Sequence, residues 1–199
     1  VIADETADPE LVAADLLGQA EHGPTSPASL VTTSEDLAKA VMEEIGRQLG
    51  ELRTADVAGA AWRDHGTVVV AESREEAVLL MDEIAPEHLE VHTEEDGWYL
   101  ENLRNYGSLF LGGRSTVAYS DKGMTGTNHV LPTAGAARYT GGLSVAKFTK
   151  TLTYQRVTDD GGTRRLAPPV VRFSRTEGLW AHEATARKRL ERLGEGGSI

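Results

Sequence analysis

Segments with strand character alternate with segments of helix character along the first half of this chain. Four short apolar runs are expected to form strands, at residues 29–32, 67–71, 89–91 and 108–111. The run at 67–71 is of the kind that is buried within parallel sheets. Segments expected to form helices lie at residues 9–22, 35–52, 54–62, 73–84 and 96–105. A strand, a helix and another strand in succession form the βαβ unit of parallel sheets. The alternation therefore predicts an α/β fold, a mostly parallel sheet flanked by helices in an incomplete Rossmann-like domain.

The second half of the chain carries fewer regular signals. Residues 114–142 are rich in Gly, Thr and Ser, and such a long irregular stretch inside a compact domain is usually functional. A short helix is expected near residues 144–149 and a strand near 151–157. A hairpin-like turn or linker is expected at residues 159–162.

Both ends of the chain carry information. Val1-Ile2 reads as the end of a strand whose beginning is missing, which suggests a fragment of a longer protein; a processed or trimmed N-terminus is the alternative. A helical tail is expected to begin at Pro168-Pro169 and to be interrupted by Gly178. We therefore predict three segments: an α/β segment carrying the site at residues 1–142, a connection at 143–165 and the tail at 166–199.

The composition excludes several functional classes. The formal net charge is -11, from 31 acidic and 20 basic residues, which argues against a nucleic-acid or anionic-membrane surface because such surfaces need basic patches. The chain has no cysteine, so any metal site must use nitrogen and oxygen ligands. No apolar run approaches the roughly 20 residues of a transmembrane helix, and no signal peptide is evident. A cytoplasmic enzyme is the simplest prediction.

The pair Glu87-His88 places a carboxylate beside an imidazole directly after a proline. Pro86 lacks a backbone N–H and disfavours the helical conformation at the residue before it, so the preceding helix should end there. The pair should then lie in a connection or at a strand start, where α/β proteins place their chemistry. It could act as a base and a proton shuttle, because imidazole titrates near neutral pH. The alternative is a strand start with two solvated side chains.

Two residues are candidate metal ligands on spacing and residue type. Gln19 and His22 are three apart on one helix and share a face, where they could supply an oxygen and a nitrogen to a metal. The alternative is a polar helix end at which the dipole favours His. Asp121 is expected to be a loop carboxylate, and most such residues form turns.

Further polar residues have weaker support from the sequence alone. His129 lies in a loop bounded by Gly and Pro, which favours a close approach to a ligand. Glu177 and His182 lie in the helical tail, where a solvated helix face is the default. His65 and His92 have no candidate partners around them and are assigned no function. No G-x-G-x-x-G or P-loop motif occurs, so the residues that would bind a dinucleotide stay unassigned.

Six motifs follow one another in a fixed order along the chain. They are Asp15–Gly23, Ile84–Leu89, Gly107–Gly112, Thr127–Thr133, Gly142–Val145 and Glu177–His182. With these motifs the chain resembles the C-terminal half of the histidinol dehydrogenase family over nearly all of its 199 residues. The resemblance implies a zinc-dependent, NAD-linked dehydrogenase that oxidises L-histidinol through histidinal to L-histidine, in histidine biosynthesis. It also implies a homodimer with a shared active site, and a missing N-terminal half that makes most NAD contacts.

The resemblance also implies roles for individual residues. It matches four residues to zinc ligands: Gln19, His22, Asp121 and, from the tail of the partner subunit, His182. His88 matches the general base, and Glu87 matches the residue that activates water to attack the aldehyde. Substrate contacts are matched to the four ligands and to three further residues, His88, His129 and Glu177.

The loop that follows Asp121 leaves the substrate open. It is one residue longer than the usual family stretch, and its Asp121-Lys122 and Gly126–His129 resemble paralogues that oxidise other small polar alcohols, including sulfonated diols. The presence of Glu87 favours formation of an acid without naming the substrate. A non-catalytic α/β fragment for dimerisation or binding and a purely structural zinc site are the remaining alternatives.

Overall fold

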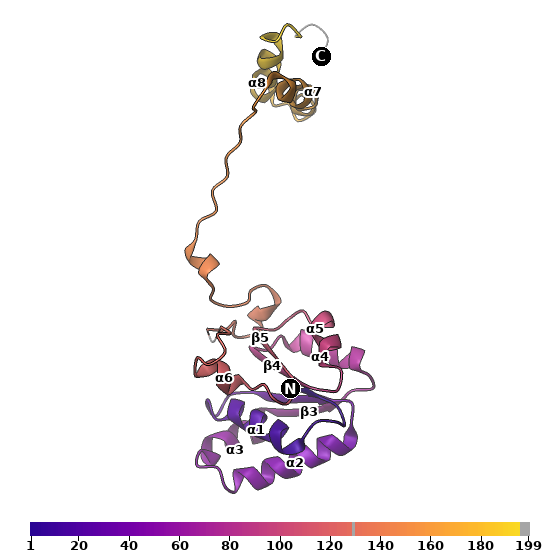
Figure 1. Cartoon of the computed structure of the whole chain (residues 1–199), viewed down its shortest axis with the longest axis vertical. Coiled ribbons are helices and arrows are strands. Elements are labelled where there is room, and N and C mark those ends of the chain that lie inside the picture. Colours follow the sequence, from indigo (N-terminus) through magenta and orange to yellow (C-terminus); the bar gives the residue numbers. More distant parts are fainter. Residues whose placement is uncertain (129, 196–199) are drawn as a thin grey trace. The chain divides into compact units, whose positions relative to one another are not determined.

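The computed structural model describes residues 1–128 and 130–195. The chain divides into two compact units, Val1–Thr149 and Lys150–Ile199 (Figure 1). The division into three segments at residues 142 and 165 stays a prediction. No helix among the described residues is both long and apolar enough to cross a membrane.

The first unit is built on a five-stranded sheet with the strand order β3-β2-β1-β4-β5. The strands are β1 (Ile2–Ala3), β2 (Ala28–Thr32), β3 (Gly66–Val70), β4 (His88–His92) and β5 (Ser108–Leu111). Every neighbouring pair is parallel, and β1 lies between β2 and β4, with Ile2 opposite both Val31 and Val91. This arrangement confirms the predicted α/β fold with a parallel sheet.

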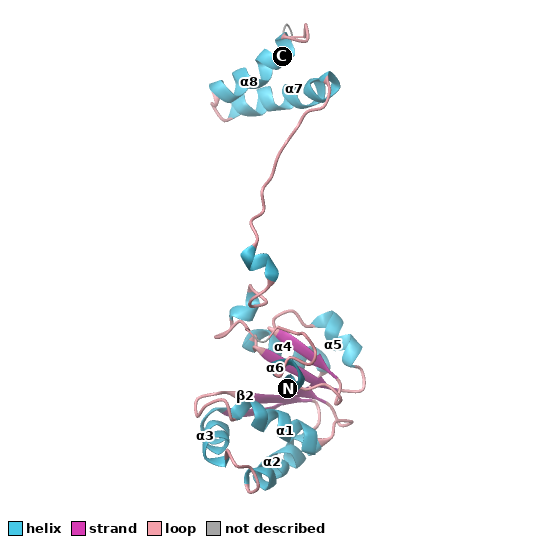
Figure 2. Cartoon of the chain, turned by 60° about the vertical axis from the view of Figure 1, so that its left-hand side comes forward, coloured by secondary structure: helices cyan, strands magenta, loops and turns pink. Residues whose placement is uncertain are grey.

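Helices cover both faces of the sheet (Figures 1 and 2). The described residues of this unit form six α-helices and two short 3-10 helices, at Ala136–Arg138 and Val145–Phe148. The α-helices are α1 (Pro9–Ala20), α2 (Glu35–Leu49), α3 (Ala55–His65), α4 (Arg74–Ile84), α5 (Asp96–Asn102) and α6 (Val117–Asp121). Successive strand residues point to opposite faces, so Ala3 and Leu30 pack with α1, α2 and α3, while Ile2 and Val31 pack with α4 and α5. Each face therefore has its own apolar core.

Local signals in the sequence set the ends of the helices. Ser73 accepts the N–H of Glu76 at 3.2 Å and begins α4 as predicted, while the Glu76 carboxylate accepts the N–H of Glu72 at 2.6 Å. The helix ends at Ile84 because Ala85 adopts a left-handed conformation with φ 51° and Pro86 follows. The predicted end of this helix before Pro86 is confirmed.

Several helix ends differ from the prediction. α2 ends at Leu49 instead of residue 52, with Gly50 as its C-terminal cap. α5 ends at Asn102 instead of residue 105, since the N–H groups of Arg104 and Asn105 donate to Asp82 Oδ1 at 3.0 and 2.8 Å. The side chain of Asp82 therefore replaces the helical hydrogen bonds that these residues would otherwise make.

The prediction that the strand near residues 67–71 is buried within the sheet is wrong. β3 lies at the edge of the sheet, and Val70 is 48% exposed. An apolar run indicates that a segment forms a strand of a sheet. The position of that strand in the sheet depends on which strands it pairs with, here β2, and the run does not specify these.

The second unit differs most from the prediction. Residues 151–157, all of them described, form no strand, and Leu152 and Tyr154 are exposed with no neighbouring strand to pair with. The predicted turn at residues 159–162 is instead the start of α7 (Asp160–Thr176), because Asp159 caps the helix by accepting the Gly162 N–H at 2.7 Å.

Pro168 and Pro169 therefore lie inside α7 and do not begin the tail. Gly178, with φ 73°, interrupts the tail as predicted, and α8 (Trp180–Glu191) follows it. The two helices pack around a small core of Ala167, Val171, Ala186 and Leu190.

Candidate functional site

One face of α1 lies opposite one face of β4. Asp15 and Gln19 are four apart on α1 and share a face. On β4, His88, Glu90 and His92 alternate with Leu89 and Val91, which are fully buried in the core under α4 and α5. Because strand residues alternate between faces, the polar side chains of β4 all point toward α1.

Gln19 and His88 meet between these elements. Gln19 Oε1 lies 3.0 Å from His88 Nδ1. An amide oxygen only accepts hydrogen bonds, so Nδ1 carries the ring proton and Nε2 has a free lone pair. Burial lowers the pKa of the His88 imidazole below its ordinary value of 6.5, which keeps the ring neutral at physiological pH. A neutral imidazole with one free nitrogen can accept a proton.

Two more predicted site residues act electrostatically on His88. The charge of Asp121 raises the pKa of His88 and that of His22 lowers it, so both lie within electrostatic reach of the ring. His22 follows the end of α1 and is exposed, since the helix stops at Ala20 instead of residue 22. Asp121 is the last residue of α6 and not a loop residue as predicted, because Thr116 caps a short helix that the Gly-rich composition of this stretch concealed.

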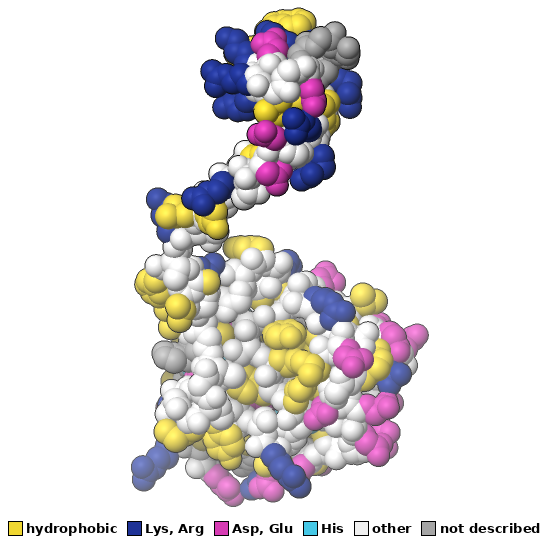
Figure 3. Space-filling model, turned by 45° about the horizontal axis from the view of Figure 1, so that its top comes forward, with side chains coloured by type: hydrophobic (Ala, Val, Ile, Leu, Met, Phe, Trp, Pro, Cys, Tyr) yellow, Lys and Arg dark blue, Asp and Glu magenta, His cyan; other side chains and the backbone are white. Residues whose placement is uncertain are grey.

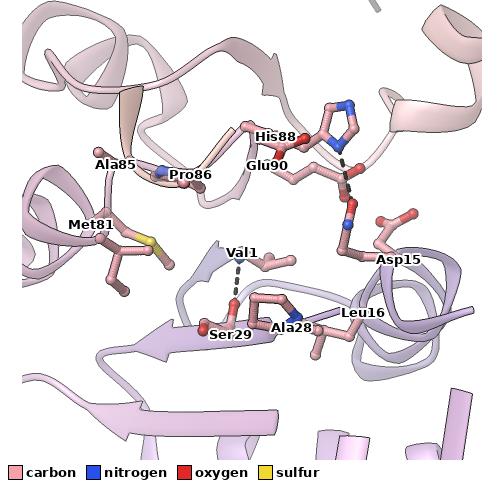
Figure 4. Close-up of a pocket in the computed structure, with 16 residues that line it drawn as sticks. Val1, Asp15, Leu16, Ala28, Ser29, Met81, Ala85, Pro86, His88 and Glu90 are labelled. Atoms are coloured by element: carbon pink, nitrogen blue, oxygen red, sulfur yellow. Dashed lines mark hydrogen bonds between the residues drawn. The ribbon is translucent and has the colours of Figure 1, made fainter. Parts of the chain in front are cut away.

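Glu87 and His88 border a cavity of about 230 Å³ within the first unit. Asp15, His88 and Glu90 surround it together with apolar side chains such as Met81 (Figure 4). The start of β5 fixes the backbone at this border, where the N–H groups of Gly107 and Ser108 donate to the carbonyls of Pro86 and Glu87 at 3.0 and 2.8 Å.

The site lies at the amino ends of the strands. His88 is the first residue of β4, and Gln19 lies near the C-terminal end of α1, which runs antiparallel to the strands. Open parallel sheets generally bind ligands at the carboxyl ends of their strands. The prediction of a strand start is confirmed, but the edge of the sheet is the opposite of the one that this generalisation favours.

The sequence reasoning missed three polar residues beside this site. Asp15, Glu90 and His92 form the only group of three His, Asp or Glu side chains, among the described residues, whose ligand atoms all lie within 4.8 Å of one another. His92, to which the sequence assigned no function, is buried here. The alternation in His88-Leu89-Glu90-Val91-His92 was a signal that could have placed all three polar residues of β4 on one face.

The remaining predicted site residues are not part of this geometry. His129 lies outside the described residues. Glu177 caps the end of α7 and His182 lies in the first turn of α8, both of them exposed in the second unit. Their assigned roles, like those of the other site residues, stay predictions.

The donor atoms near His88 are of types that suit zinc. The predicted ligands of the first unit offer an imidazole nitrogen from His22, a carboxylate from Asp121 and the amide oxygen of Gln19. Gln19 contacts the imidazole of His88, and the charges of Asp121 and His22 both act on its pKa. The residues present therefore fit a metal with nitrogen and oxygen ligands.

Comparisons with known proteins agree on one family. A family model described as histidinol dehydrogenase matches residues 1–190. The chain is 51% identical over 197 residues to a histidinol dehydrogenase homolog of Shouchella clausii, covering 98% of this chain and 46% of that protein. It is 49% identical to the sulfopropanediol 3-dehydrogenase of Ruegeria pomeroyi, covering 96% and 44%. It is 42% identical to the histidinol dehydrogenase of Cereibacter sphaeroides, covering 98% and 45%.

A solved structure gives the same result for the fold. The crystal structure of histidinol dehydrogenase from Elizabethkingia anophelis superposes with a TM-score of 0.90 at 37% identity, covering 97% of this chain and 44% of that one. The chain thus spans about half the length of the proteins that it matches.

Proposed function

Because this chain belongs to the histidinol dehydrogenase family, we propose that it is the C-terminal part of a zinc-dependent, NAD-linked dehydrogenase that oxidises a small polar alcohol. The observation that carries the proposal is the 3.0 Å contact between Gln19 Oε1 and His88 Nδ1, which leaves His88 Nε2 able to accept a proton. The relatives named as dehydrogenases support the class of reaction.

In this proposal Gln19, His22 and Asp121 hold the zinc ion, with His182 of the partner subunit as the fourth ligand. When bound, the ion would orient the substrate and polarise its hydroxyl group. NAD would be held mainly by residues that precede this chain in the longer relatives.

His88 would act as the general base. Its Nε2 would take the proton of the substrate hydroxyl, since Gln19 fixes the proton of the ring on Nδ1. The lowered pKa keeps the ring ready to accept. Glu87, next in the chain and on the border of the same cavity, would take a proton from water in a second oxidation that forms an acid.

The homodimer is supported by exposed apolar side chains in the second unit. Leu152 and Tyr154 are 75% and 94% exposed, which is unusual for large apolar groups unless a partner covers them. Apolar side chains also appear as yellow patches on the visible face of the first unit (Figure 3). A partner subunit and the part of the enzyme that precedes this chain are the proposed covers.

Two substrates are candidates within this chemistry. L-Histidinol is the first candidate, since its oxidation to L-histidine needs a second step in which water attacks an aldehyde; Glu87 fits such a step but does not name the substrate. The identities support a sulfonated diol instead, since the chain is 49% identical to the sulfopropanediol 3-dehydrogenase and 42% to a histidinol dehydrogenase. Lys122, exposed beside Asp121, offers a cation for a sulfonate.

The test uses the chain joined to the part that precedes it in the longer relatives. NADH formation and thermal unfolding are measured with L-histidinol and with sulfopropanediol, with and without a zinc chelator. Turnover of one alcohol that the chelator abolishes supports the proposal and names the substrate. His22→Ala should abolish zinc-dependent stabilisation, while the matched variant His65→Ala, which changes an exposed histidine at the end of α3, should not. A well-folded protein that neither binds zinc nor oxidises either alcohol contradicts the proposal.

A further inference from the structure

The group formed by Asp15, Glu90 and His92 is a closed hydrogen-bonded cluster. His92 Nε2 lies 3.2 Å from Asp15 Oδ2 and 3.5 Å from Glu90 Oε2. The other oxygens are also bonded, since Thr116 Oγ1 donates to Asp15 Oδ1 at 3.0 Å and the Val117 N–H donates to Glu90 Oε1 at 2.9 Å. All four carboxylate oxygens therefore have a partner.

This closure argues against a second metal site. The ligand atoms are close enough together for an ion, but each carboxylate oxygen already faces a proton donor. The His92, Glu90 and Asp15 side chains are 3%, 5% and 15% exposed, so two carboxylates lie largely away from solvent beside one imidazole. Protonated His92 offsets part of their negative charge, which a buried pair of carboxylates requires.

The cluster joins the same three elements that carry the proposed site. Asp15 comes from α1, Glu90 and His92 come from β4, and Thr116 and Val117 begin α6. The site residues on these elements are Gln19 on α1, His88 on β4 and Asp121 on α6. Asp15 lies one helical turn from Gln19, Glu90 lies two residues from His88, and α6 is a single turn that ends at Asp121.

Building such a junction from charged groups is costly compared with an apolar one. Apolar side chains of similar volume generally stabilise a core as well or better. The charged junction instead fixes the relative orientation of the elements, because each hydrogen bond sets an angle and a distance between two of them. Apolar packing does little to hold α6 in place, because Ser120 is the only buried residue of this helix. The hydrogen bonds of Thr116 and Val117 therefore fix its position.

We propose that Asp15, Glu90, His92 and Thr116 form a positioning cluster that holds α1, β4 and α6 in the geometry in which Gln19, His22 and Asp121 bind zinc beside His88. This inference rests on the proposed function. The four residues do not touch the substrate or the ion; they act through the residues that do.

The test compares Thr116→Val with Thr116→Ser in the chain joined to its preceding part. Valine has a similar volume but donates nothing to Asp15 and accepts nothing from the Ala118 N–H, whereas serine keeps the hydroxyl. Glu90→Gln is a second variant, which keeps an oxygen for the Val117 N–H and turns the group that faces His92 into a donor. Thr6→Val is the matched control, because it also removes a hydroxyl that donates to a carboxylate, that of Asp4, outside the cluster.

Zinc affinity is measured by competition with a chelator, and hydrogen exchange is measured for the amides of residues 117–121. Thr116→Val and Glu90→Gln are expected to weaken zinc binding about tenfold, the lower end of the loss that follows removal of a ligand's own hydrogen-bond partner, because the cluster acts on the ligands only through the elements that carry them. The amides of α6 should also exchange faster in both variants, while Thr116→Ser and Thr6→Val match the wild type. If Thr116→Val caused a general structural defect instead, its unfolding temperature would fall and Thr116→Ser would also lose zinc affinity. That result would contradict the positioning cluster.

The two proposals fail in different ways. A wild-type protein that binds no zinc overturns the proposed function. Faster exchange of the α6 amides in Thr116→Val and Glu90→Gln would then test whether the cluster holds α6 in place, without reference to zinc. Zinc affinity and α6 exchange that stay unchanged in Thr116→Val and Glu90→Gln overturn the positioning cluster while the proposed function stands.

Discussion

The buried imidazole of His92 should make the stability of this protein fall as the pH rises through about 9. Burial alone would lower the pKa of His92, but the hydrogen bonds and charges of Asp15 and Glu90 outweigh it and raise the pKa from 6.5 to about 9. A group with a raised pKa in the folded state stabilises that state below its unfolded pKa. This contribution is lost as the pH rises through the folded value.

The size of the effect follows from the two values. Each pH unit between them corresponds to about 1.4 kcal/mol, so the interval from 6.5 to about 9 gives about 3 kcal/mol. Little of this is screened by solvent, because the His92 side chain is 3% exposed. Burial also raises the pKa of Glu90 above its ordinary value of 4.5, with a further rise from the charge of Asp15, so Glu90 shifts stability in the same direction.

The assay is denaturant unfolding at several pH values from 6.5 to about 10, past the raised pKa of His92. The free energy of unfolding of the wild type should drop across this interval by about 3 kcal/mol more than that of His92→Gln, whose amide does not titrate. His65→Gln is the matched control and should follow the wild type, since His65 is exposed. Equal pH dependence of the wild type and His92→Gln would refute the reasoning that His92 is held protonated by the two carboxylates.

Three further predictions follow from individual contacts. Gly107→Ala should destabilise the protein by about 1–3 kcal/mol in denaturant unfolding, because its Cβ would lie 2.5 Å from the Glu87 carbonyl oxygen and 2.8 Å from Pro132 Cδ; unchanged stability would contradict this close approach. Gln19→Leu should lower kcat about 100-fold or more in steady-state kinetics, since Nδ1 of His88 loses the acceptor that fixes its proton; a wild-type rate would rule out this role. Leu190→Ala should cost about 2–5 kcal/mol and melt α7 and α8, seen as a loss of helical circular dichroism, because Leu190 is 1% exposed in a core with three other buried residues; Leu166→Ala, at an exposed position of α7, is the control.

Much of the fold could be predicted because its signals are local. Ser73 and Pro86 bound α4 through hydrogen bonding and steric effects that involve only neighbouring residues. The place of β3 at the sheet edge could not be predicted in this way, because it depends on which strands pair. The start of α7 was missed because Asp159 and two glycines resemble a turn, although the same aspartate side chain also caps a helix.

The candidate site was only partly accessible from the sequence. The resemblance supplied Gln19 and His88, and the structure brings them into contact. Asp15 and His92 were missed because their importance arises from α1 lying over β4, a contact between segments far apart in the chain. Spacing within a single segment carries no information about such a contact, whereas the alternation along β4 shows only which residues share a face.

The two faces of β4 have a consequence for how this family can vary in length. Leu89 and Val91 fill the core on one side of the strand, and His88, Glu90 and His92 serve the site on the other. A shift of β4 by one residue against β1 and β5 would exchange the two sets, burying charges in the core and losing the site together. Evolution can therefore change β4 by substitution but not by a shift of register. Length changes are expected in the loop after Asp121, where an additional residue leaves the strand untouched.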